Sequence, residues 1–149
     1  MIKKNSIIYI TGHKGLVGSS LLNLLKKKGY KNIVISEKKN LNLLDKVKVE
    51  HFIKKKKVEF IINCAAKVGG ILANSSDPVS FFYENIQIQN NLLIAAKKFK
   101  IKRFIFLGSS CIYPKHAKTP ITEDQLLSGK LEKTNEAYAL AKISGIKLY

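Results

Sequence analysis

Four short runs of apolar residues, separated by segments with helical periodicity, constrain the fold more than any other feature of this sequence. They lie at 7–10, 33–35, 60–62 and 104–107, and isoleucine is their commonest residue. Strands that are apolar along their whole length are typical of a parallel sheet covered by helices on both faces. The pattern predicts an α/β fold with a doubly wound parallel sheet, the Rossmann arrangement, with the first strand between the second and the fourth.

Helix signals fill the segments between these runs. Apolar residues fall at helical spacing over 17–25, and Gly29 is placed to end that helix. A short helix is expected to start near Asp45, a long one after the capping residue Asp77, and a last one near Asn135. Strands and helices therefore alternate, as a parallel sheet requires.

Three glycines follow the first apolar run and precede the first helix. Gly12, Gly15 and Gly18 form a GxxGxxG pattern, which differs from the GxGxxG fingerprint. Glycines let the backbone turn tightly and approach a pyrophosphate, and the helix N-terminus supplies N–H groups and the positive end of a dipole. Glycines also mark ordinary turns, but between a strand and a helix they predict a dinucleotide-binding site.

The residues after the second run bear on the choice between NAD and NADP. An acidic residue there would bind the ribose 2′-hydroxyl, whereas a cation would accommodate a 2′-phosphate. Glu37, Lys38 and Lys39 offer both, and Lys14 in the glycine turn adds another cation. We favour NADP; the alternative is that these lysines are only solvated surface residues.

Tyr138 and Lys142 stand four residues apart and so share one face of the last helix. A lysine cation near a phenol favours the phenolate, which is expected to lower the tyrosine pKa towards neutrality. Tyr138 could then exchange a proton with a substrate hydroxyl or carbonyl while a nicotinamide exchanges a hydride, and Lys142 could hold the nicotinamide ribose. The alternative, a surface pair without chemistry, is less compatible with a glycine turn in the same chain.

A serine-containing stretch follows the fourth run, at the carboxyl edge of the predicted sheet where ligands of this fold bind. A hydroxyl of Ser109 or Ser110 could stabilise charge on a substrate oxygen, or bond only to the local backbone. Cys111 could be an acid/base thiol or a small packing residue, and Cys64 is expected only to pack.

Composition excludes several other classes. The net charge of +17 would suit a nucleic-acid binder, but the lysine clusters at 26–28, 54–57 and 97–98 lie near predicted helix ends, where cations favour the dipole. No apolar run approaches the roughly 20 residues of a membrane span, and no signal peptide is evident. The two cysteines lack metal-ligand spacing. We expect a cytoplasmic protein without metal, membrane or nucleic-acid partners.

The last helix runs to Tyr149 through apolar residues without a capping residue, and the fourth strand would form an open sheet edge. We therefore expect residues 1–149 to be an incomplete NAD(P)-binding Rossmann domain, truncated after the helix that carries YxxxK. A C-terminal domain that would bind the substrate is then absent. A naturally short domain is the alternative.

Five stretches together resemble a known family: Gly12–Gly18, Leu41–Asp45, Ala65–Ile71, Gly108–Lys115 and Thr134–Lys142. They are similar to the extended short-chain dehydrogenase/reductases that act on nucleotide sugars, and within that family to the GDP-L-fucose synthases. The resemblance implies an NADPH-dependent epimerase/reductase that acts on GDP-4-keto-6-deoxy-D-mannose. It also implies a homodimer for the full-length protein.

The resemblance assigns roles to four residues. Ser109 matches the catalytic serine, Tyr138 the general acid and Lys142 its partner, while Cys111 matches the acid/base that epimerises the carbons next to the ketone. The implied cofactor contacts are Gly12, His13, Lys14, Gly15, Leu16, Val17, Gly18, Lys38, Lys39, Asn40, Leu41, Asn42, Leu43, Leu107, Gly108, Ser109, Ser110 and Lys142.

Two departures from the family pattern matter. Lys14 stands where the family usually has arginine, and the family's second epimerisation residue, a histidine, lies with the GDP-sugar contacts beyond Tyr149. We therefore expect this chain alone to bind cofactor weakly and to be inactive. Alternatives are another nucleotide-sugar epimerase or dehydratase, which would not need Cys111, and a non-catalytic NADP-binding module.

Overall fold

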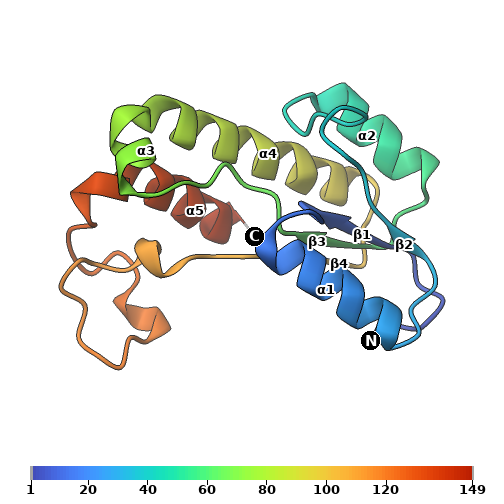
Figure 1. The fold of residues 1–149 in the computed structure, drawn as a ribbon, viewed down its shortest axis with the longest axis horizontal. Helices are drawn as coiled ribbons and strands as arrows, with labels where there is room; N and C mark the ends of the chain where they lie inside the picture. Colours follow the sequence, from blue (N-terminus) through green and yellow to red (C-terminus); the bar gives the residue numbers. More distant parts are fainter. Residues whose placement is uncertain (1, 149) are drawn as a thin grey trace. The chain divides into compact units, whose positions relative to one another are not determined.

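The structure, a computed structural model, describes residues 2–148 and divides into two compact units (Figure 1). Unit 1 comprises the residues up to Ala66 together with Gln87–Leu107, and unit 2 comprises Lys67–Ile86 together with the residues from Gly108 onwards. The elements of unit 1 are β1 (Ile8–Thr11), α1 (Leu16–Lys27), β2 (Ile33–Val34), α2 (Lys46–Lys55), β3 (Phe60–Asn63), β4 (Arg103–Phe106) and the C-terminal part of α4 (Pro78–Lys98).

The four strands of unit 1 form one parallel sheet in the order β2-β1-β3-β4. The parallel sheet was predicted correctly, but the predicted order, in which the fourth strand is the direct neighbour of β1, is wrong, because β3 pairs directly with β1. The predicted order needs a strand on the outer side of β2. Residues 35–45 form turns and irregular structure instead, so the next strand in the chain returns to the other side of β1.

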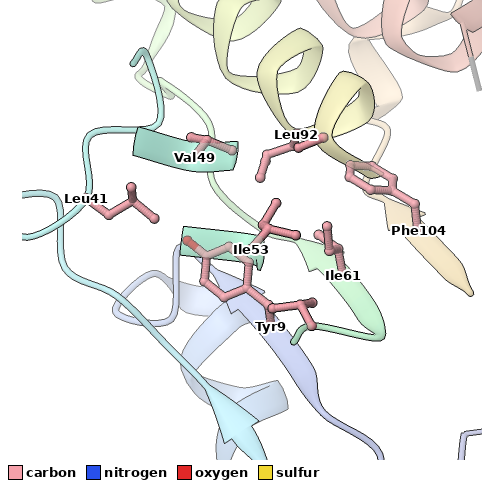
Figure 2. Packing of buried hydrophobic residues seen from close by; sticks show 9 residues of the cluster. Tyr9, Leu41, Val49, Ile53, Ile61, Leu92 and Phe104 are labelled. Carbon is pink, nitrogen blue, oxygen red and sulfur yellow. The ribbon is translucent and has the colours of Figure 1, made fainter. Parts of the chain in front are cut away.

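Helices cover both faces of this sheet because successive strand residues point to opposite sides. On one face, Tyr9 and Ile61 pack with residues of α2 and α4, including Ile53 and Leu92 (Figure 2). On the other face, a second buried cluster packs against the apolar side of α1 and consists of Ile8, Ile10, Phe60 and Ile62. The double coverage explains why β1 and β3 are apolar except at their last residues, Thr11 and Asn63.

Two predicted helix ends and the predicted placement of lysines are confirmed in unit 1. Gly29 follows the last residues of α1 with φ +81°, a conformation that favours glycine. Asp45 precedes α2, and its carboxylate accepts the Lys48 N–H at 3.0 Å. Lysines occupy the last turns of α1, α2 and α4, as the charge pattern predicted.

Unit 2 contains a short helix that the sequence analysis missed, α3 (Ile71–Ser76), which begins directly after Gly69 and Gly70. Its apolar residues Ile71 and Leu72 are largely exposed. The sequence of this short helix therefore lacks the repeating apolar pattern that is typical of a buried helix face. Unit 2 also holds the first part of α4, α5 (Glu136–Leu148) and three 3-10 turns: η1 (Ser110–Ile112), η2 (Glu123–Gln125) and η3 (Lys133–Asn135). The Asp77 carboxylate accepts the Ser80 N–H at the start of α4, as predicted.

Within unit 2, α5 packs against η1 and η3, and α3 packs against η3. These contacts bring the stretch after β4 next to the helix that carries Tyr138. Among residues 2–148, no helix combines the length and apolar character that crossing a bilayer requires.

Candidate functional site

The glycine turn of unit 1 links β1 to α1, and two of its glycines are required by the turn itself. Gly12 has φ +63°, and a Cβ atom there would lie 2.7 Å from the Cys64 carbonyl. At Gly18, a Cβ atom would lie 2.2 Å from the Gly12 carbonyl oxygen. Any larger residue at either position would collide with backbone, so these glycines are explained without a ligand.

Gly15 differs from its two neighbours in the pattern. A Cβ atom there would meet only the Gly12 carbonyl oxygen, at 3.4 Å, which is an ordinary contact. Gly15 is the N-cap of α1, and no side chain caps that helix end. Its missing side chain therefore leaves the positive end of α1 open to an anionic group, which fits a dinucleotide pyrophosphate.

The turn rests on a buried polar network that the sequence analysis did not identify. The Thr11 hydroxyl donates to the Asn63 side-chain oxygen at 2.7 Å, and the Ala65 N–H donates to the Thr11 oxygen at 3.0 Å. The side chains of Thr11 and Asn63 are almost fully buried. They join the end of β1 to the segment against which Gly12 packs. The signal in the sequence was a polar residue at the end of each apolar strand.

His13 and the lysine of the turn have different surroundings. The Nδ1 atom of His13 is buried and has no hydrogen-bond partner among the described residues. Lys14 instead extends to Glu37, with its Nζ 2.8 Å from Oε1, and Lys39 Nζ lies 3.5 Å from Oε2 of the same carboxylate. The hydrogen bond from Lys14 is the largest cause that lowers the pKa of Glu37.

The stretch expected to contact cofactor, 38–43, begins in a turn held by the Glu37 carbonyl, which accepts the N–H groups of Asn40 and Leu41 at 2.9 Å. The side chain of Leu41 is buried in the core and that of Leu43 is half-buried against it, while their contact with a cofactor stays a prediction. Lys38 and Asn42 are exposed. Their contact with a cofactor stays a prediction.

In unit 2, the side chain of Ser109 interacts with the side chains of both Cys111 and Tyr138. Its hydroxyl donates to the Cys111 Sγ at 3.3 Å and accepts the Cys111 N–H at 3.4 Å, as the capping residue of η1. It is also hydrogen-bonded to the Tyr138 phenol, and this bond lowers the pKa of Tyr138. The structure thus places a thiol, a hydroxyl and a phenol in one chain of contacts.

The expected lowering of the Tyr138 pKa is not found. Burial raises the pKa of this phenol, the Ser109 hydrogen bond lowers it, and the charge of Cys111 raises it, with an upward result. Lys142 is 4% exposed, and its Nζ lies 5.8 Å from the centre of the Tyr138 ring. The shared helix face is confirmed, but loss of hydration outweighs any effect of the lysine cation.

The other predicted residues of this region are less constrained. Ser110 is exposed, Leu107 is half-buried, and a Cβ atom on Gly108 would make only ordinary contacts. Among residues 2–148, no group of three or more His, Cys, Asp or Glu side chains could hold a metal ion.

A second feature that the sequence analysis missed fixes the Ala65–Ile71 stretch. The buried Asn85 accepts the Lys67 N–H and donates to the Lys67 carbonyl, both at 2.9 Å. The Lys67 ammonium lies 3.0 Å from Glu84 and 3.3 Å from Asp77. These contacts hold the start of this stretch against α4 within unit 2.

Comparison with known proteins agrees with this geometry. Residues 8–149 match the sequence model of the NAD dependent epimerase/dehydratase family. The GDP-L-fucose synthase of Escherichia coli (strain K12) is 46% identical over 141 residues, which cover 95% of this chain and 44% of that protein. The GDP-L-colitose synthase of Yersinia pseudotuberculosis is 48% identical over 141 residues, which cover 95% of this chain and 46% of that protein.

The fold of this chain also closely matches that of a solved structure. It is the GDP-D-glycero-L-gluco-heptose synthase of Campylobacter jejuni in the presence of NADPH, with a TM-score of 0.96 and 36% identity. The match covers 99% of this chain and 43% of that one. This chain spans less than half the length of the curated relatives it matches.

Proposed function

Because this chain belongs to the NAD dependent epimerase/dehydratase family, we propose that it carries the cofactor-binding and proton-transfer residues of a GDP-L-fucose synthase. The proposed reaction is the NADPH-dependent epimerisation and reduction of GDP-4-keto-6-deoxy-D-mannose to GDP-L-fucose. Several curated relatives that are 45–47% identical to the chain have this name. The substrate is accordingly a GDP-sugar.

The observation that carries the proposal is the contact of Ser109 with both Cys111 and Tyr138. A reductase, a 4-epimerase or a dehydratase needs the serine, tyrosine and lysine, but not a thiol beside them. A thiol is useful where a carbon next to a ketone loses and regains a proton. The position of Cys111 therefore favours an enzyme that epimerises before it reduces.

NADPH would supply the hydride that reduces the ketone carbon. Tyr138 would give its proton to the ketone oxygen as that oxygen becomes a hydroxyl. The raised pKa of Tyr138 suits this direction, because the phenol stays protonated at neutral pH. Ser109 would donate a hydrogen bond to the same oxygen, and Lys142 would stabilise the phenolate that results.

In the epimerisation step, Cys111 would exchange a proton with one face of a carbon next to the ketone, and the second acid/base, which the resemblance places beyond Tyr149, would exchange a proton with the opposite face, so that the configuration inverts. The electrons move into the carbonyl, so the intermediate carries its negative charge on the oxygen. Hydrogen bonds from Ser109 and Tyr138 to that oxygen would lower the barrier. A homodimer and a cytoplasmic location stay predictions.

The proposal is tested by substituting Cys111 in the protein expressed from its entire coding sequence. In deuterated water without NADPH, the native enzyme should exchange the protons next to the ketone, as followed by NMR. Cys111→Ser should slow this exchange by about 100-fold or more, because one acid/base group is lost. Reduction of the ketone by NADPH should persist.

Cys64→Ser is the matched control, since Cys64 is a half-buried thiol in unit 1. Unchanged exchange in Cys111→Ser would favour another nucleotide-sugar epimerase or a dehydratase. The relative named GDP-L-colitose synthase, at 48% identity, makes GDP-L-colitose the second candidate product. Identification of the product sugar by NMR separates the two.

A further inference from the structure

We propose that the edge of the unit 1 sheet opposite the glycine turn is a docking surface for a membrane that contains anionic lipids. This surface, named here the basic edge, consists of residues 3–4, 26–31, 54–57 and 97–103. It contains fifteen lysine and arginine residues and no acidic residue, and all fifteen cationic side chains are exposed. Membrane docking would be a property separate from the proposed reaction, and it replaces the sequence-based expectation of no membrane partner.

The topology of unit 1 gathers these four segments at one edge. The strands are parallel, so they all begin at the same edge, and α1, α2 and α4 run back between them and end there, on the right of Figure 1. Backbone hydrogen bonds join the segments. The Lys31 N–H donates to the Lys4 carbonyl at 3.4 Å, the Glu59 N–H to the Ile7 carbonyl at 3.0 Å, and the Lys102 N–H to the Glu59 carbonyl at 2.9 Å. Lysine clusters that the sequence analysis assigned to separate helix ends therefore form one surface.

The positive charge of the chain is confined to unit 1. This unit contains 20 lysine and arginine residues and four acidic residues, a net charge of +16. Unit 2 contains seven and six, a net charge of +1. A general enrichment of the sequence in lysine would raise the charge of both units. Helix dipoles favour lysines in the last helical turns, but not those in the segments that precede the strands, such as Lys4, Lys31 and Lys102.

Two lysines of the basic edge occupy backbone positions that favour glycine. Lys57 follows α2 with φ +50°, and Lys100 follows α4 with φ +52°, whereas the corresponding residue after α1 is Gly29. A residue with a Cβ atom is less stable in this left-handed conformation than glycine is. Cations are thus present where folding alone favours glycine, as expected of a surface whose charge has a role of its own.

The shape of the basic edge fits a planar partner. Because α1 covers one face of the sheet and α2 and α4 cover the other, the lysines are distributed over three layers. The edge of a four-stranded sheet is about 14 Å wide, and a helix adds about 10 Å on either side. The charge is therefore spread in two directions, as a lipid surface is, and not along a single stripe.

The side chains also favour lipid headgroups over a nucleic acid. Nucleic-acid sites commonly use arginine forks and open aromatic rings on which bases stack. Only Arg103 of the fifteen cations is an arginine. The rings of Tyr30 and Phe99 are half-buried, and lysine ammonium groups lie 4.3 Å and 5.7 Å from their centres. Lysines act as point charges, which attract an anionic membrane surface without recognising a particular sequence.

The test measures sedimentation of the protein, expressed from its entire coding sequence, with vesicles. The native protein should bind vesicles in which about a third of the phosphatidylcholine is replaced by phosphatidylglycerol, but not vesicles of phosphatidylcholine alone. High salt should release it. Combining Lys28→Gln, Lys56→Gln and Lys97→Gln should weaken binding by about 100-fold, because each lysine near an anionic surface contributes roughly a factor of five.

The matched control combines Lys118→Gln, Lys130→Gln and Lys133→Gln. These three lysines are exposed residues of unit 2, so the net charge changes equally, and vesicle binding should stay close to the native value. A loss as large as that of the unit 1 variant would show that net charge, and not the basic edge, is responsible.

A second variant separates docking from folding. Lys57→Gly with Lys100→Gly should weaken vesicle binding by about 25-fold, by the same factor of five for each lysine. The free energy of unfolding should not fall, because glycine adopts the left-handed conformation without strain. Unchanged vesicle binding in this variant would contradict the proposal.

The remaining outcomes also decide the matter. Equal binding to neutral and anionic vesicles overturns the proposal. So does binding of duplex RNA at a salt concentration that releases the protein from anionic vesicles, because the surface would then be a nucleic-acid site. The glycine turn follows β1 and lies at the opposite edge, so vesicles should not change the affinity for NADPH. Vesicle binding without any NADPH binding would contradict the proposed cofactor site and leave the docking surface intact.

Discussion

At the scale of single residues, the phenol of Tyr138 is subject to opposite influences from its neighbours. Burial raises its pKa, while the hydrogen bond with Ser109 lowers it. The hydroxyl of Ser109 stabilises the charged phenolate more than the neutral phenol, and this hydrogen bond therefore lowers the pKa of Tyr138. Ser109 is therefore expected to control how readily Tyr138 gives up its proton, besides any contact with a substrate.

Ser109→Ala should raise the pKa of Tyr138 further above its ordinary value, because the group that favours the phenolate is removed. Ultraviolet titration of tyrosinate measures this, and subtraction of the Tyr138→Phe titration isolates the signal of Tyr138. Ser110→Ala is the control, since its side chain is exposed. A lower pKa in Ser109→Ala would contradict the hydrogen-bond assignment.

Residue spacing predicted part of this site. The interval of four residues placed Tyr138 and Lys142 on one helix face, and the structure agrees. The direction of the Tyr138 pKa shift was wrong, because spacing gives no information on how much water reaches a side chain. The contact of Ser109 with Cys111 was not predicted, although the two residues lie close in the chain, and the pairing of Glu37 with Lys14 depends on the strands that bring them together.

At the scale of elements, the β1–α1 turn separates glycines required by folding from a glycine available to a ligand. Gly18→Ala should destabilise the fold by about 3 kcal/mol, because its Cβ would overlap the Gly12 carbonyl oxygen. Gly15→Ala should change the free energy of unfolding by no more than about 1 kcal/mol, the range of helix-capping effects. It should nevertheless weaken dinucleotide binding at least about tenfold.

Urea denaturation and NADPH titration of the two variants check this pair of expectations. Gly29→Ala offers a third comparison, because Gly29 has φ +81° but a Cβ there would touch nothing. It should cost stability through backbone strain alone. Equal loss of stability in Gly15→Ala and Gly18→Ala would show that the turn does not distinguish them.

The positions of most strands and helices could be predicted from local sequence patterns, whereas the order of the strands in the sheet could not. The apolar runs and the capping residues Asp45 and Asp77 located strands and helices to within a residue or two. The strand order was wrong because it depended on whether residues 35–45 formed a further strand. The helix α3 was missed because its apolar side chains face outward.

At the scale of the whole molecule, the net charge of +17 is distributed so that many lysines have local partners. Lysines in the last turns of α1, α2 and α4 meet the negative ends of the helix dipoles. Others pair with acidic residues, as Lys98 does with Glu50 and Lys115 does with Glu132. The last turns of these three helices account for the placement of six lysines.

Tyr9 makes the stability of the fold depend on alkaline pH. Its side chain is fully buried beside Ser36, and burial raises the pKa of its phenol from 10.0 to about 12. Between these values the unfolded chain releases the phenolic proton and the folded chain keeps it. The stabilisation is therefore complete below pH 10 and is lost as the pH rises towards 12.

The stability advantage of the native protein over Tyr9→Phe should shrink and then reverse as the pH rises. At neutral pH the native protein should be more stable by about 1 kcal/mol, through the hydrogen bond to Ser36. Near pH 11 this advantage should fall by about 1.4 kcal/mol, since one pH unit has passed the ordinary tyrosine pKa. Denaturation with urea at both pH values measures the change.

Tyr83→Phe is the control for removal of a phenolic hydroxyl, because that ring is 57% exposed. A constant difference between the native protein and Tyr9→Phe would contradict the shifted pKa of Tyr9.

The close approach of Gly18 to the Gly12 carbonyl has a consequence for the history of such sequences. A descendant that abandoned its dinucleotide would still need glycine at both positions, since any side chain there would collide with backbone. Selection would cease first at Gly15, because only a bound ligand requires the absence of a side chain there. Loss of the middle glycine alone would thus mark a lineage that kept this architecture and gave up its chemistry.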